Sequence, residues 1–342
     1  MVNWPVGSTM RQMRGRNLVR LSYRVVIPCA IIAAVGWQFV MILRRPELQD
    51  FSYACRWQWL LPAGLLYLLA HTIWASFWWS LLHHQGYPAS YLTGLRAYFV
   101  SQFGKYVPGK IWVILIRVIL LGGSARDKAI VGVTATYEAL TSMAAGAILG
   151  SILLPILGIK LLKFGAQNYI LLAIAAIPLG VGLFHRLIIK IIRKKLGPDL
   201  HIPNLNLLIL VRGLLQAAVG WCLLGLSLWL VLQAVRPETC QITLIDVTRM
   251  TAINCLSYVL GFIILVAPAG GGVREYVLKQ LLSLELLSEM TQAHAEGLAV
   301  VVALVVRLVW TVAELCLALI LYRMSPSEQR HQLLAAREDA AS

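Results

Sequence analysis

Residues 104–110 read Gly-Lys-Tyr-Val-Pro-Gly-Lys, a polar and helix-breaking stretch within an otherwise apolar sequence. Glycine and proline interrupt a helix, and lysine side chains are costly near the interior of a membrane. An anionic lipid or a phosphate group would offset that cost. We therefore expect a broken helix here, with its breaks at Gly104, Pro108 and Gly109.

The composition of the 342-residue chain indicates a membrane protein. Hydrophobic residues make up 59% of it, and the mean hydropathy is +0.75. Charged residues make up 13%, against about 25% in a typical soluble domain. Several apolar stretches exceed the roughly 20 residues that cross a bilayer as a helix. The expected fold is an all-α polytopic membrane protein.

Long apolar segments alternate with shorter, broken ones along the chain. The long segments are residues 21–43, 57–83, 129–157, 167–192, 207–235, 247–267 and 297–322, and the short ones are 91–104, 107–121 and 273–287. If one short segment also crosses, the C-terminus returns to the side of the N-terminus, with about eight spans in total. The expected parts are a basic segment 1–20, a transmembrane domain 21–322 in two halves joined at 196–206, and a polar tail 323–342.

The net charge of +15 fits membrane topology better than nucleic-acid binding, because so apolar a chain offers no soluble basic face. Much of the charge lies at the ends of apolar segments, as the positive-inside rule and attraction to anionic lipids predict. We expect the plasma (inner) membrane, with both termini cytoplasmic. The cysteines are scattered, so neither a disulfide framework nor a metal site is expected.

The first interruption also matches the start of a P-loop, G-x-x-x-x-G-K, but Ile111 stands where Ser or Thr would hold magnesium. No strand precedes it, so we expect no nucleotide and no cofactor. The apolar run 111–121 instead starts a fresh half-helix, whose first N–H groups favour a phosphate. The residues expected at a lipid phosphate are Lys105, Tyr106, Lys110 and, two turns further along, Arg117. The alternative is that the lysines snorkel to the interface and Arg117 only ends the segment.

Residues 268–275 read Pro-Ala-Gly-Gly-Gly-Val-Arg-Glu and form a second interruption. The breaks are expected at Pro268, Gly270, Gly271 and Gly272. Arg274 is disfavoured by the dipole of the short helix that follows, so we expect it to meet an anion, either Glu275 or a ligand. Two such breaks in corresponding halves are typical of the substrate site of a transporter.

Three further charges, Glu138, Arg307 and Glu314, lie within long apolar segments. Arg307 and Glu314 share one helical face, so we expect a structural ion pair between them, or of either with a partner elsewhere. A proton relay is the alternative. The histidines His71, His83 and His84, like the tryptophans between residues 57 and 79, are expected at the membrane interface.

With these motifs the chain resembles the membrane domain of the lysylphosphatidylglycerol synthase family, a group of flippase-like integral membrane proteins. Lys105–Lys110 and Arg117 match that family's Lys-x-x-Pro-Gly-Lys segment and the Arg that follows it. Residues 268–275 match, with variation, its Pro-Gly-Gly-x-Gly-x-Arg-Glu segment. The family's Glu-Arg-x-x-Asp run is reduced here to Glu138. The resemblance implies an eight-span fold for moving lipids.

The resemblance implies a translocase for a phosphate-bearing lipid, either a phospholipid or a polyprenyl-phosphate-linked lipid. No segment after Tyr322 resembles the aminoacyl transferase domain of two-domain members, so we expect no lysyl transfer by this chain. One alternative is a non-transporting partner that presents a lipid-linked substrate to a separate glycosyltransferase or synthase. Another is a membrane-embedded transferase, for which the available acids are Asp127, Glu238 and Asp246.

Overall fold

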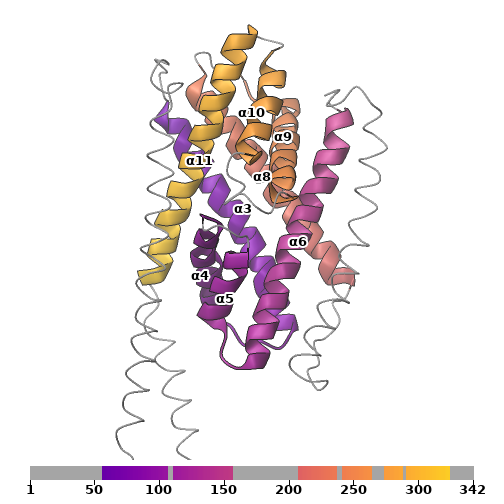
Figure 1. Cartoon of the computed structure of the whole chain (residues 1–342), viewed down its shortest axis with the longest axis vertical. Coiled ribbons are helices and arrows are strands. Elements are labelled where there is room, and N and C mark those ends of the chain that lie inside the picture. The colour runs from indigo at the N-terminus through magenta and orange to yellow at the C-terminus, as the bar shows by residue number, and fades with distance from the viewer. Residues whose placement is uncertain are drawn as a thin grey trace, which may run out of the picture. The chain divides into compact units, whose positions relative to one another are not determined.

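The computed structural model describes residues 56–106, 111–156, 207–236, 241–263, 273–287 and 290–323 (Figure 1). All of them belong to the compact unit Glu47–Ser342. Every regular element in these ranges is a helix, which confirms the all-α prediction. Several predicted features lie outside the described residues: Pro108, Gly109, Lys110, Pro268, Gly270, Gly271, Gly272, the spans 21–43 and 167–192, and the linker 196–206.

Three of the described helices are long and apolar enough to cross a membrane by length and composition: α3 (Trp57–His84), α8 (Leu207–Val235) and α11 (Gln292–Arg323). Helices α3 and α8 pack along each other, because glycines on α8 leave room for aromatic rings on α3. A methyl group at Gly213 would lie 2.2 Å from the Phe77 ring, and one at Gly220 would lie 2.1 Å from Trp74 Nε1. Such close contact over small residues is how membrane helices associate without a hydrophobic driving force.

Two further helices, α6 (Ala125–Ile156) and α9 (Leu244–Ile263), coincide with predicted spans. Helix α6 packs against α8 and α9. At the contact with α8, the Trp221 Nε1 donates a hydrogen bond to the Ser142 carbonyl over 2.8 Å, and the ring lies on Gly146. Helices α3, α6, α8, α9 and α11 together form the frame around the shorter helices.

The first interruption joins the arms of an antiparallel helical hairpin. One arm is α4 (Tyr91–Gln102) with the 3-10 turn η1 (Phe103–Tyr106), and the other is α5 (Ile111–Leu121). At the open end, the Tyr87 hydroxyl donates a hydrogen bond to the Leu121 carbonyl. At the closed end, a methyl group at Gly104 would lie 2.6 Å from the Val113 backbone nitrogen. The glycine is therefore required, because any side chain would push η1 away from α5.

The second interruption joins another antiparallel pair, α9 and α10 (Val273–Leu286), which pack together. At one end, Arg249 Nη1 on α9 lies 2.7 Å from Glu285 Oε1 on α10. At the other, a methyl group at Gly261 would lie 2.9 Å from the Arg274 Cβ. The two motifs predicted as helix breaks thus each connect two antiparallel helices.

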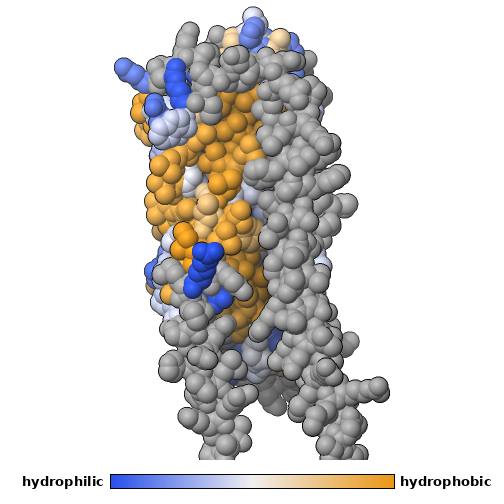
Figure 2. Space-filling model, turned by 90° about the vertical axis from the view of Figure 1, so that its left-hand side faces the viewer, coloured by the Kyte–Doolittle hydropathy of each residue, from blue (hydrophilic) through white to orange (hydrophobic). Residues whose placement is uncertain are grey.

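The short helices differ from the framing helices in length. Helix α5 has 11 residues, α4 has 12 and α10 has 14, which correspond to about 17, 18 and 21 Å. The hydrocarbon core of a bilayer is about 30 Å thick, so none of the three spans it alone. The described surface is strongly apolar on the face seen in Figure 2. Exposed leucines 61, 65 and 69 on α3 follow helical spacing, as expected for a face turned toward lipid.

Candidate functional site

A cavity of about 370 Å³ lies where the two hairpins meet the framing helices. Its lining comes from α3, α4, η1, α5, α6, α9, α10 and α11. Tyr106 and Ile111 border it from either side of the first interruption, and Phe262 and Arg274 from either side of the second. The fold therefore brings two sequence motifs that are far apart in the chain to one cavity.

Arg117 and Glu138 form a buried ion pair in the wall of this cavity. Arg117 Nη1 lies 2.9 Å from Glu138 Oε2, with the side chains 2% and 7% exposed. The Arg117 Nε donates a hydrogen bond to Ser101 Oγ over 3.0 Å. Its guanidinium also lies 4.4 Å from the ring centres of both Trp78 and Tyr98. Arg117 is thus held by an anion, a hydroxyl and two aromatic faces.

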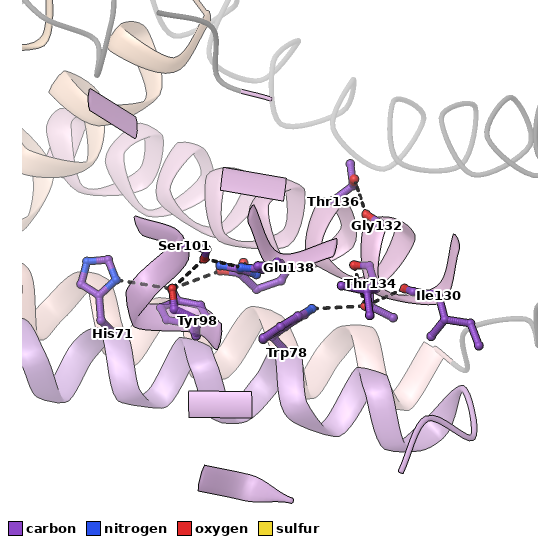
Figure 3. A network of polar contacts seen from close by, with 11 residues as sticks. His71, Trp78, Tyr98, Ser101, Ile130, Gly132, Thr134, Thr136 and Glu138 are labelled. Atoms are coloured by element: carbon purple, nitrogen blue, oxygen red, sulfur yellow. Dashed lines mark hydrogen bonds and ion pairs between the residues drawn. The ribbon is translucent and has the colours of Figure 1, made fainter. Parts of the chain in front are cut away.

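A chain of polar groups continues from this ion pair to α3. The Tyr98 hydroxyl donates to Glu138 Oε1 over 3.5 Å and lies 3.3 Å from His71 Nδ1 (Figure 3). His71 is 6% exposed, and its Nε2 is buried without a hydrogen-bond partner among the described residues. Helix α3 thus turns His71 toward the cavity, among other helices.

Lys105 forms the second ion pair of the cavity, with Glu314 on α11. Its Nζ lies 2.7 Å from Glu314 Oε2 and 2.9 Å from Oε1. The Tyr67 hydroxyl donates to the same carboxylate over 3.0 Å. Glu314 is fully buried, whereas the Lys105 side chain is 29% exposed. Next to it, the hydroxyls of Tyr106 and Thr311 lie 2.8 Å apart.

The third ion pair joins Arg307 on α11 to Glu275 on α10. The sequence suggested that Arg307 pairs with Glu314, and that Glu275 is one possible partner of Arg274. In the structure, Glu314 pairs with Lys105 and Glu275 pairs with Arg307. Residues 307, 310, 311 and 314 share one face of α11 because they follow helical spacing. That face holds the second hairpin through Arg307 and the first hairpin through Thr311 and Glu314.

Arg274 is the cation of the cavity whose contacts are aromatic. Its guanidinium lies 3.6 Å from the ring centre of Tyr258 and 5.1 Å from that of Trp310. Within the part of the chain that the structure describes, no carboxylate lies within ion-pair distance of it. Its expected partner Glu275 is occupied by Arg307. Among the described residues, Arg274 is thus the cation of the cavity that has aromatic contacts and no carboxylate partner.

The amino-acid sequence matches the profile of the lysylphosphatidylglycerol synthase TM region over residues 25–318. This chain belongs to that family. The match covers most of the 342 residues, including both hairpins and the cavity they border. No curated protein matches the chain. The family and the helices long enough to span a bilayer together indicate an integral membrane protein.

Several residues at the cavity of this family member were not predicted from the sequence. Those that line it are Tyr67, His71, Tyr98, Tyr258, Trp310 and Thr311, and Ser101 accepts a hydrogen bond from the lining residue Arg117. One signal was present: Tyr67, His71, Trp74 and Trp78 recur at spacings of four, three and four, which place them on one face of a helix. Trp74 and Trp78 are 6% and 0% exposed, so that face is buried against other helices.

Metal ligands do not gather at this site. Across the described ranges, no group of three His, Cys, Asp or Glu side chains is arranged to hold a metal ion. What the cavity offers to a ligand is guanidinium and ammonium groups, hydroxyls and aromatic faces. These are groups that recognise phosphate and other oxyanions.

Proposed function

We propose that this protein is a lipid translocase whose cavity holds the phosphate-bearing headgroup of a membrane lipid. The observation that carries the proposal is Arg274, a cation at the cavity with aromatic contacts and no described ion-pair partner. A cation within a membrane is costly unless an anion accompanies it. The headgroup phosphate of the ligand would be that anion.

The charges around the cavity support an anionic ligand. Its cations are Lys105, Arg117, Arg274 and Arg307, and the carboxylates that pair with three of them are Glu314, Glu138 and Glu275. Among the described residues this leaves Arg274 as the surplus positive charge. Helices α5 and α10 also begin beside the cavity, so the positive ends of their dipoles lie on its side.

The apolar part of the lining supports a lipid over a soluble anion. Ile114, Leu140 and Met143 line the side formed by α5 and α6. Ile111 and Phe262 also line the cavity, and they are 59% and 37% exposed. A headgroup inside the cavity and hydrocarbon chains in the bilayer would suit this division. The short hairpin arms would then be re-entrant, with their tips within the membrane.

Reconstitution into vesicles tests the proposal. The full chain would be placed in liposomes that contain a chain-labelled fluorescent phospholipid or prenyl phosphate, and lipid movement would be followed by quenching of the outer leaflet. Arg274→Gln is expected to slow movement by roughly tenfold, the loss of one charge-assisted hydrogen bond. Arg212→Gln is the matched control, since Arg212 is exposed on α8 and is not part of the cavity lining.

Two results would count against the proposal. Equal rates for wild type and Arg274→Gln would remove Arg274 from the headgroup site. Lipid binding without any movement would favour the alternative role, in which the protein presents a lipid-linked substrate to a separate glycosyltransferase or synthase. Copurification of such an enzyme would then be the next measurement.

A further inference from the structure

We infer that Glu314 and Glu275 set the charge of the headgroup that the cavity accepts, and that they match it to a phosphodiester with one negative charge. The inference rests on the proposed function and adds the chemical class of the ligand. It concerns selectivity between lipids that all carry phosphate. A diester-linked phospholipid and a prenyl phosphosugar share this chemistry, whereas phosphate monoesters and diphosphate-linked lipids carry more charge.

Glu314 neutralises the cation at the tip of the first hairpin. Both of its oxygens lie within 3 Å of Lys105 Nζ, at 2.9 and 2.7 Å, and it is completely buried. The Tyr67 hydroxyl donates to it as well. A carboxylate held in this way stays beside Lys105 and reduces the positive charge that Lys105 presents to a ligand.

Glu275 has the same effect on Arg307 at the second hairpin. Arg307 and Glu314 are seven residues apart on α11, about 10.5 Å along the helix axis. The ion pair of Glu275 with Arg307 and the ion pair of Glu314 with Lys105 therefore lie about two turns apart along α11. Each carboxylate comes from a different element, since Glu275 lies on α10 and Glu314 on α11.

Among the described residues of the cavity, the remaining charges leave one positive charge without a carboxylate. Arg117 is balanced by Glu138 and is enclosed by Ser101 and two rings. Arg274 is the described cation that these carboxylates do not balance. A second negative charge on the ligand would be poorly compensated in a site of low dielectric constant, which is costly. The site therefore favours a diester over a monoester or a diphosphate.

A binding competition tests this selectivity without requiring transport. The purified full chain in detergent would be offered phosphatidylglycerol and phosphatidic acid with identical acyl chains, and bound lipid would be counted by native mass spectrometry. The measurement is made at pH 8, because the second pKa of a phosphate monoester is about 6 and the monoester is then doubly charged. A second arm offers a prenyl phosphosugar against a prenyl diphosphosugar, which separates glycerolipid from prenyl sources of the same diester.

Wild-type protein is expected to prefer the diester by roughly tenfold in at least one arm. Glu314→Gln and Glu275→Gln each remove a carboxylate and are expected to shift the preference toward the doubly charged lipid by roughly tenfold. Glu285→Gln is the matched control, because Glu285 pairs with Arg249 and neither residue lines the cavity. Two independent variants guard against the loss of folding in one of them.

The outcomes separate this inference from the proposed function. A wild-type preference for the doubly charged lipid in both arms, or no shift in either Glu variant, overturns the inference. No lipid binding at all overturns both. The expected shifts in binding without lipid movement in vesicles support the inference and contradict only the translocase role.

Discussion

Individual charged residues at the cavity divide into those that are enclosed and those that are available. Arg117 is 2% exposed and is held by Glu138, Ser101 and two rings. Lys105 is partly exposed but is paired with a buried carboxylate. Arg274 is stacked on Tyr258, a contact that leaves its N–H groups in the ring plane of the guanidinium free to donate. The roles of these three cavity cations therefore differ because their partners differ.

Removal of one member of the enclosed pair is expected to destabilise the protein. Glu138→Ala leaves the Arg117 charge buried and unpaired, at a cost of about 3 to 5 kcal/mol. The double variant Arg117→Met, Glu138→Ala removes both charges and is expected to recover most of the loss. Unfolding of the purified protein in detergent measures both. The single variant Arg117→Met completes the comparison. If the double variant loses as much unfolding free energy as the two single variants added together, the ion pair is not the source of the effect.

Replacement of Arg274 by Lys separates charge from shape at the proposed headgroup site. Lysine keeps the positive charge but loses the planar guanidinium that stacks on Tyr258 and donates two parallel hydrogen bonds. Lipid binding by Arg274→Lys is expected to lie between that of wild type and that of Arg274→Gln. Native mass spectrometry on the three proteins makes the comparison. Identical binding by the Lys and Gln variants would mean that charge alone is not recognised.

Among the elements, the two hairpins are each closed by a backbone contact at a glycine. Gly104 lets η1 touch the start of α5, and Gly261 lets α9 touch the start of α10. Helix α11 then ties the two hairpins together, through Glu314 to the first and through Arg307 to the second. The position of the cavity thus depends on two glycines and on one face of one helix.

Gly104→Ala is expected to lower stability and lipid binding together. The new methyl group would lie 2.6 Å from the Val113 nitrogen and 2.7 Å from the Trp112 carbonyl carbon, so η1 and α5 must separate. The expected cost is about 1 to 3 kcal/mol, as for overpacked cores. Gly64→Ala is the control, because its methyl group would meet Ala313 at an ordinary 3.5 Å. The same stability in both variants, measured by unfolding in detergent, would contradict the hairpin contact.

The long helices were predictable from the sequence because each is one continuous apolar run. The span predicted at 57–83 is α3, Trp57–His84, and the span predicted at 207–235 is α8. Helix α11 begins at Gln292, earlier than the predicted 297, because a helix extends past the apolar run into the polar residues before it. The short helices α5 and α10 were also expected after the two interruptions, since Pro and Gly mark where a helix must restart.

The partners of the charges were not predictable from the sequence. Spacing on one helical face suggested that Arg307 pairs with Glu314, but Glu314 pairs with Lys105, a residue 209 positions earlier. Such a choice depends on which helices pack together, and local spacing carries no information about that. The same holds for Tyr67, Tyr98 and Tyr258, whose hydroxyls or rings acquire a role only when α3, α4 and α9 surround the cavity.

Most of the described helices line the cavity, so a ligand bound in it would contact most of them. A ligand that binds only the folded form stabilises it, by about 2.7 kcal/mol at one hundred times its dissociation constant. Headgroup binding in the cavity, as proposed, would therefore be coupled to the stability of the folded protein.

Addition of a phosphodiester lipid is expected to raise the unfolding temperature of the detergent-solubilised protein. The rise should grow with lipid concentration, because it depends on the logarithm of ligand over dissociation constant. In Arg274→Gln the rise should largely disappear, while Arg212→Gln should behave as wild type. Equal rises in all three proteins would show that the lipid acts on the surface and not in the cavity.

The glycine contacts also have a consequence for how related sequences can differ in length. An inserted or deleted residue between Gly104 and Val113 would change which residue of α5 faces Gly104. The same applies to α9 and α10 around Gly261 and Arg274. Insertions and deletions in relatives that keep the cavity should therefore fall outside residues 104–113 and 261–274. The number of residues between each glycine and the residue that it faces becomes a criterion for recognising this site in other sequences.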